Sequence, residues 1–121
     1  PSGRDLCYLS PRFVVNRFGS RGIGYLAASA NGKMELQETF GGKIVENCTQ
    51  SIARDLLAHA MQNLEAAGYP IVFHVHDECV MEVPIGQGSV AEACRIMAIP
   101  PDWARDLPLR ADGEEMEFYR K

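Results

Sequence analysis

The sequence predicts an α+β protein in which one long helix and one short helix pack on an antiparallel sheet. Apolar residues recur at helical spacing between residues 43 and 67, and two β-prone runs flank a short polar break within residues 71–83. The composition agrees, because 121 residues with 46% hydrophobic and 23% charged side chains suit one globular domain. Disordered, collagen-like and disulfide-scaffold classes are therefore excluded.

Residues 1–40 form a basic region that favours strands and turns. A short apolar run at residues 13–15 precedes the segment 16–24, which holds three glycines together with Arg17 and Arg21. This pattern predicts a hairpin with a long basic tip. Two further strands are expected on either side of Asn31-Gly32, the dipeptide that most readily adopts the positive φ angles of a tight turn.

A long amphipathic helix is predicted over residues 43–67. Its apolar positions follow one another at i, i+4 steps: Ile44, Cys48, Ile52, Leu56, Ala60 and Leu64. Gly68 provides a C-terminal stop. Asn47, Gln50 and Arg54 recur at i, i+3 and i+7, so they form a second stripe of hydrogen-bonding side chains beside the apolar one.

The remaining elements are a hairpin, a helix and two strands. The hairpin covers residues 71–83 and must bend at His76-Asp77 or Asp77-Glu78, although two-residue turns favour asparagine and glycine. Such a bend suggests a functional constraint. A short helix is expected over residues 89–98, and C-terminal strands over 107–120 on either side of Asp112-Gly113. Without repeats or linkers, we expect one domain over residues 1–121.

Charge and cysteine usage narrow the class further. The net charge is −4, yet residues 1–33 carry five basic side chains and one acidic side chain, so a polyanion would meet this end first. The four cysteines are scattered without a C-x-x-C pair, which fits the reducing cytoplasm. No apolar run reaches the roughly 18 residues of a membrane span, so no membrane partner is expected.

The densest group of chemically active residues lies at the hairpin break and leaves three interpretations open. Asp77 and Glu78 place hard oxygen ligands side by side, as a magnesium site for phosphoryl or nucleotidyl transfer requires. His74 and His76, two residues apart on a strand, could instead ligate zinc or iron in a hydrolase, although His59 is the only other histidine. The third interpretation is a polar turn that binds nothing.

Two motifs at a specific spacing carry a resemblance to a known family. The run GGKIVENCTQSIARDLL at residues 41–57 is followed by FHVHDE at 73–78 and MEVP at 81–84. Together they closely resemble the C-terminal palm of family A DNA polymerases, the DNA polymerase I family, and phage forms above all. PSGR at residues 1–4 and LPLRADG at 107–113 extend the similarity over nearly the whole chain.

The resemblance implies a palm subdomain and a role for each matched residue. Residues 75–78 look like motif C, whose aspartate binds the catalytic metal pair, Mg²⁺ or Mn²⁺, so Asp77 would be the metal ligand. Glu78 matches an assisting acidic residue, and His76 matches a histidine against the primer terminus. Gln50 matches a glutamine that hydrogen-bonds in the DNA minor groove, with Asn47 and Arg54 as neighbours along the primer-template duplex.

The chain also departs from the family pattern. Glu46 stands where relatives usually have asparagine, with Asn47 one position later. The motif A region with the first catalytic aspartate, and the fingers that grip the incoming dNTP, match no part of this chain. We therefore expect the isolated chain to be inactive and to need fingers, thumb and motif A from elsewhere.

Three functions follow from the sequence, in order of preference. The first is part of a DNA-directed DNA polymerase in the cytoplasm of a bacterial or phage-infected cell. The second is a non-catalytic palm-like remnant, or one half of a split polymerase that acts through a partner chain. The third is the histidine-ligated metal hydrolase. An uncovered palm helix would also favour self-association of the chain.

Overall fold

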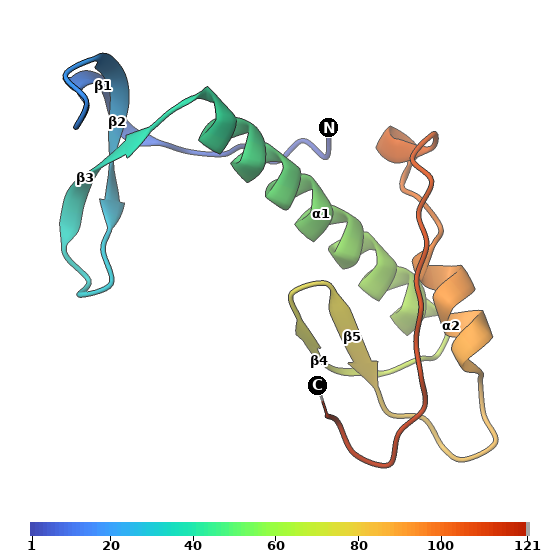
Figure 1. Cartoon of the computed structure of the whole chain (residues 1–121). Helices are drawn as coiled ribbons and strands as arrows, with labels where there is room; N and C mark the ends of the chain where they lie inside the picture. Colours follow the sequence, from blue (N-terminus) through green and yellow to red (C-terminus); the bar gives the residue numbers. More distant parts are fainter. Residues whose placement is uncertain (121) are drawn as a thin grey trace. The chain divides into compact units, whose positions relative to one another are not determined.

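The computed structural model describes residues 1–120: three strands precede the long helix, and two strands, a short helix and a 3-10 helix follow it (Figure 1). In order they are β1 (Leu9–Val15), β2 (Arg21–Ala28), β3 (Met34–Thr39), α1 (Gly41–Ala66), β4 (Ile71–Val75), β5 (Glu78–Met81), α2 (Val90–Met97) and the 3-10 helix η1 (Asp102–Ala104). The chain forms two compact units. One runs from Gly3 to Ser51; the other joins Pro1–Ser2 to the chain from Ile52 onward, so α1 contributes to both.

The first unit holds a three-stranded antiparallel sheet in the order β1-β2-β3. Gly24 lies at its centre, buried, in the middle strand. A Cβ at this position would come within 2.9 Å of Val14 Cγ1 and 3.1 Å of Leu36 Cδ1. Only glycine therefore leaves room for these side chains of the two outer strands to pack against the middle strand. Pro11 is accommodated because β1 is an edge strand with an irregular register between Leu9 and Arg12.

Both turns of this sheet form where the sequence predicts them, with different lengths. The basic tip is shorter than expected and covers residues 16–20, because Asn16 Oδ1 accepts hydrogen bonds from the amides of Phe18 and Ser20 and closes the loop. At the second turn the Ser29 amide donates to the Lys33 carbonyl, which leaves three residues in the loop instead of two. Gly32 adopts φ +76°, as this class of hairpin requires at its last loop position.

The long helix α1 spans Gly41–Ala66, so the predicted helix over residues 43–67 is confirmed with its start two residues earlier. The amides of Ala67 and Gly68 donate back to the last helical turn, and Gly68 adopts φ +88° as a helix-ending glycine does. Of the predicted apolar stripe, Ala60 and Leu64 are buried, and Leu57 beside it is buried as well, whereas Cys48 is exposed. The core therefore begins in the second half of the helix.

The second unit packs around Leu64, whose side chain is completely buried. Tyr69, Ala93 and Ile96 complete the buried cluster, so the end of α1, the segment before β4, and α2 share one core. Four side chains of the β4–β5 hairpin and the segment just after it pack against this cluster: Ile71, Cys79, Met81 and Val83. The hairpin is thereby fixed to a helical support, with its turn left outside the core.

Helix α2 begins with a hydrogen-bonded cap that includes a tyrosine from outside the helix. Ser89 is the N-cap, and its side chain accepts a hydrogen bond from the Glu92 amide at 3.1 Å. The Tyr69 hydroxyl donates to Glu92 Oε2 at 2.6 Å and accepts the Ser89 amide proton at 3.1 Å. In an ordinary capping box the Glu92 carboxylate would accept the hydrogen bond from the Ser89 amide directly. Here the Tyr69 hydroxyl lies between the two groups and bonds to both.

The α+β class with two helices is confirmed, and two details of the prediction are wrong. The strands form two separate antiparallel sheets, β1-β2-β3 and β4-β5, where one sheet was expected. Residues 107–120 contain no strand, although C-terminal strands were predicted there. The β-prone side chains of this segment have no neighbouring strand with which to form a ladder. A single subdomain over residues 1–121 stays a prediction.

Candidate functional site

The candidate site is the turn of the β4–β5 hairpin. In the antiparallel register His74 lies opposite Cys79 and Val75 lies opposite Glu78, which leaves His76 and Asp77 as the whole turn. The sequence prediction of a hairpin bending at His76-Asp77 is therefore confirmed. The register is irregular between Ile71 and Phe73, and the regular ladder from Phe73 onward holds the turn.

His76 adopts φ +53°, one of two non-glycine residues with positive φ among those described. Two-residue hairpin turns need positive φ, and asparagine or glycine usually supplies it. Histidine is tolerated in the left-handed region better than most side chains, but at a cost in conformational free energy. The hairpin therefore carries backbone strain at the residue whose neighbours are the candidate metal-binding carboxylates.

His76, Asp77 and Glu78 are all exposed. Asp77 sits at the second turn position, so its carboxylate extends from the end of the hairpin, while the inner side chains of β5 anchor the strand to the core. Glu78 begins β5 directly after it. Adjacent carboxylates on a supported turn can present hard oxygen ligands to a divalent cation arriving from solvent.

The C-terminal segment contacts this hairpin through Tyr119. The Tyr119 hydroxyl donates a hydrogen bond to Glu78 Oε2 at 3.0 Å, and its ring meets Phe73 edge-to-face at a centroid distance of 5.1 Å. The hydrogen bond to Glu78 raises the pKa of the Tyr119 phenol, and loss of solvent contact raises it further. Sequence reasoning missed this contact, because nothing local to Tyr119 points to a partner 41 residues earlier.

Arg54 acts electrostatically on the same hairpin. Burial raises the pKa of the Cys79 thiol, and the positive charge of Arg54 opposes that rise. Cys79 packs against the core and keeps its proton at neutral pH, so it is a structural thiol. Arg54 itself is exposed on α1.

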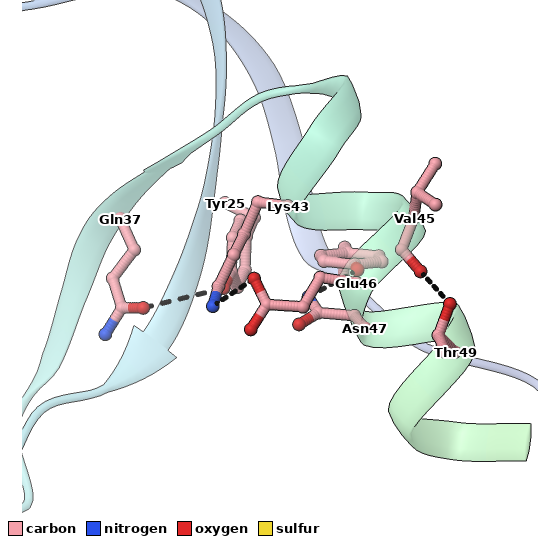
Figure 2. A network of polar contacts seen from close by, with 8 residues as sticks. Tyr25, Gln37, Lys43, Val45, Glu46, Asn47 and Thr49 are labelled. Carbon is pink, nitrogen blue, oxygen red and sulfur yellow. Dashed lines mark hydrogen bonds and ion pairs between the residues drawn. The ribbon is translucent and has the colours of Figure 1, made fainter. Parts of the chain in front are cut away.

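Gln50 and Asn47 lie in the part of α1 that belongs to the first unit, and they differ in environment. Gln50 is exposed, as a residue that contacts a ligand must be. Asn47 is half-buried, and its Nδ2 donates to the Tyr8 hydroxyl at 2.9 Å (Figure 2). Tyr8 in turn meets the ring of Tyr25 edge-to-face at 4.9 Å, which ties this turn of the helix to β2.

Glu46 has a different partner from its neighbour Asn47. Its carboxylate forms an ion pair with the ammonium group of Lys43, three residues earlier in the helix, and Lys43 Nζ lies 3.0 Å from Glu46 Oε2 (Figure 2). Both side chains are about half exposed, so the pair adds little stability. Glu46 thus makes a local helix contact at the position where the family pattern has asparagine.

The histidine-ligated hydrolase receives no geometric support. Strand β4 ends at Val75, so the alternation expected to place His74 and His76 on one strand face does not extend to His76. His59 Nε2 is buried within α1 and has no hydrogen-bond partner. Across residues 1–120, no three His, Cys, Asp or Glu side chains come together as a metal-binding group.

The absence of such a group among residues 1–120 also limits a magnesium site formed by this chain. The donor chemistry of Asp77 and Glu78 suits Mg²⁺, but two carboxylates do not complete its ligand shell. Asp77 and Glu78 fit one side of such a shell, and water or oxygen atoms of other groups would have to supply the rest. None of the helices described here is long and apolar enough to cross a membrane.

Comparison with known proteins gives one match. Over its full length the chain is 43% identical to a stretch of a protein named "DNA polymerase" from Bacillus phage SP02, and it spans 19% of that protein. No protein-family model matches the chain. No solved structure is similar to it. The chain is thus similar throughout to one fifth of a phage DNA polymerase.

Proposed function

We propose that this chain is the palm part of a family A DNA-directed DNA polymerase and that its β4–β5 hairpin carries motif C. The observation that supports this most strongly is the full-length similarity to a phage DNA polymerase, combined with the exposed turn at Asp77. That relative is about five times longer than the matched stretch, so the remaining polymerase parts would lie in other segments of a larger enzyme.

In this proposal Asp77 supplies one ligand to Mg²⁺, or to Mn²⁺ in its place. A metal held there would supply activation of the primer 3′-hydroxyl and stabilisation of the charge on the leaving pyrophosphate. Asp77 is exposed at the turn, so a cation can reach its carboxylate from solvent. Its partner carboxylate would come from motif A, outside the matched region.

Other residues of the chain would position the primer and the duplex. His76, held at the turn, would contact the primer terminus, and Glu78, oriented by the Tyr119 hydroxyl, would assist at the site. Gln50 would donate to the minor-groove acceptors that all base pairs share, which senses pairing geometry instead of sequence. Arg54 would pair with backbone phosphate, and Asn47 would contribute after exchanging its bond to Tyr8.

The first test is the size of the polypeptide in source cells, measured by immunoblot with an antibody against this chain. A band several times heavier than 13.4 kDa is expected for a larger polymerase. A band near 13.4 kDa would instead favour a split polymerase half or a remnant, and co-purification would then identify its partner chain.

The second test is primer extension by the purified natural polypeptide. Asp77→Asn should abolish extension on primed DNA with dNTPs and Mg²⁺, because it removes one charged ligand while leaving the exposed turn folded. Asp106→Asn, an equal change at another exposed aspartate, is the matched control and should extend normally. Equal extension by the Asp77→Asn and wild-type proteins would refute the assignment of motif C. The isolated 121-residue chain should show no extension with either sequence.

A further inference from the structure

The β1–β2 hairpin carries cationic and aromatic side chains that the proposed polymerase site does not use. The Arg21 guanidinium carbon lies 3.8 Å from the centroid of the Phe13 ring, and that of Arg17 lies 4.7 Å from the Phe18 ring. Phe13 and Phe18 are 68% and 76% exposed. We call these four residues, Phe13, Arg17, Phe18 and Arg21, the basic–aromatic cluster.

The strand register explains why Phe13 and Arg21 meet. Arg21 lies directly opposite Val15, and Ile23 lies opposite Phe13. Side chains two residues apart share a face of a strand, so Phe13 and Arg21 are diagonal neighbours on one face of the sheet. Val15 and Ile23 extend this face and are exposed as well. The face is therefore open to solvent, with an arginine stacked on its aromatic ring.

The cluster sits in the most positively charged stretch of the chain. Residues 6–34 contain Arg12, Arg17, Arg21 and Lys33 but no aspartate or glutamate, although the whole chain is acidic. Within the described residues, neither Arg17 nor Arg21 forms an ion pair with a carboxylate. A guanidinium that lies over a ring keeps its N–H edges available for an anion.

We propose that the basic–aromatic cluster binds an unpaired stretch of DNA, with phosphates at Arg17 and Arg21 and bases stacked on Phe13 and Phe18. Aromatic rings beside cations are how proteins hold single strands without reading sequence, because every base has a stacking face. Charge complementarity favours a polyanion over a protein partner here. The choice of DNA over RNA rests on the proposed polymerase function; the binding surface itself does not.

The test titrates a fluorescein-labelled oligo-dT with the 121-residue chain at low salt and follows anisotropy. Phe13→Ala with Phe18→Ala should weaken binding by about 5- to 150-fold per stacked base lost. Arg17→Gln with Arg21→Gln should also weaken it, and should reduce the slope of log K against log salt by about 0.7 for each arginine. The matched control, Arg105→Gln with Arg110→Gln, makes the same charge change at two exposed arginines of the other unit and should bind as wild type does.

Two further experiments distinguish base stacking on the phenylalanine rings from charge attraction to the arginines. An abasic oligomer keeps the phosphates and lacks bases, so the phenylalanine variants should bind it as well as the wild type does. In the wild-type chain, addition of oligo-dT should shift the NMR signals of residues 13–21, a result that depends on no variant. Equal oligo-dT affinity of the Arg17/Arg21 and Arg105/Arg110 double variants would overturn the proposal. NMR shifts confined to residues outside 13–21 would overturn it as well.

The outcome is distinguishable from a failure of the polymerase assignment. Asp77→Asn is tested in primer extension alone, and oligo-dT affinity is tested with the phenylalanine and arginine variants of the cluster, so either proposal can fail while the other stands. A dimer that the phenylalanine variants dissociate in sedimentation, with oligo-dT affinity unaltered, would show that the face binds a second copy of the chain and would refute DNA as its ligand. Equal affinity for duplex and oligo-dT would refute the preference for unpaired strands.

Discussion

Tyr119 donates a hydrogen bond to Glu78 at 3.0 Å and so fastens the C-terminal segment to the first residue of β5. The contact needs a protonated phenol and a free carboxylate oxygen. Because the ring also rests against Phe73, the segment has both a polar and an apolar attachment to the hairpin. A residue 41 positions away thus contacts one of the two carboxylates of the candidate site.

The contact should weaken at alkaline pH. Its hydrogen bond raises the pKa of Tyr119 above 10.0, so the stabilisation is fully present below that pH and is lost as pH rises through the raised pKa. NMR titration of ring-labelled tyrosine should show Tyr119 ionising later than a free phenol. Glu78→Gln should bring its pKa back toward 10.0, while Glu92→Gln should move only Tyr69. An unchanged Tyr119 titration in Glu78→Gln would contradict the contact.

Leu64→Ala should destabilise the second unit by about 2–5 kcal/mol, because it removes a fully buried side chain and leaves a cavity where α1, α2 and the hairpin meet. Urea denaturation followed by circular dichroism measures the change. Val45→Ala, at a 64% exposed position of the same helix, is the control and should stay within about 0.5 kcal/mol of wild type. Equal stability of the two variants would argue against the core described here.

Ser89→Ala should lower the free energy of unfolding by about 0.5–2 kcal/mol, because the Glu92 amide loses its acceptor at the start of α2. Ser89→Asn keeps a side-chain oxygen at the same position and should retain most of the stability. Thermal denaturation of both variants distinguishes loss of the cap from any change at an exposed residue. Equal losses in the two would mean that the cap does not act as the structure indicates.

His76→Gly should stabilise the hairpin by up to about 1 kcal/mol, because glycine adopts positive φ without the cost that histidine bears. His74→Gly, in the middle of β4, is the matched control and should destabilise by about 0.5–1 kcal/mol. If His76 contacts the primer terminus, His76→Gly should also lower primer extension by the natural polypeptide. If His76→Gly and His74→Gly both raise, or both lower, the free energy of unfolding, the turn is not strained at His76.

Local patterns in the sequence predict most of the elements correctly. The helical spacing of Ile52, Leu56 and Leu64 indicates α1, and the β-prone run before His76 indicates the hairpin, because each depends on contacts between near neighbours. The hairpin turn is also predicted, with His76-Asp77 and Asp77-Glu78 as the two candidate bends, and the pairing of Val75 with Glu78 selects the first. The roles assigned to Asp77, Glu78 and Gln50 remain predictions that the resemblance supports.

The errors arise where long-range contacts decide the structure. Residues 116–119 have β-prone side chains, yet Tyr119 packs on Phe73 and bonds to Glu78 without joining a sheet. The Tyr69 bridge to the α2 cap is equally invisible in local patterns, because Tyr69 lies 20 residues before Ser89 and 23 before Glu92. Neither partner is close enough in sequence for a pattern to indicate it.

The two-residue turn has a consequence for how this hairpin can change through evolution or engineering. Side chains alternate between the faces of a strand, so one residue added to β4 or β5 would exchange the core-facing side chains with the solvent-facing ones. Cys79 and Met81 would then leave the core. The hairpin should therefore accept many single substitutions, but insertions and deletions only in pairs, and sequence variation among relatives should preserve its length more strictly than its composition.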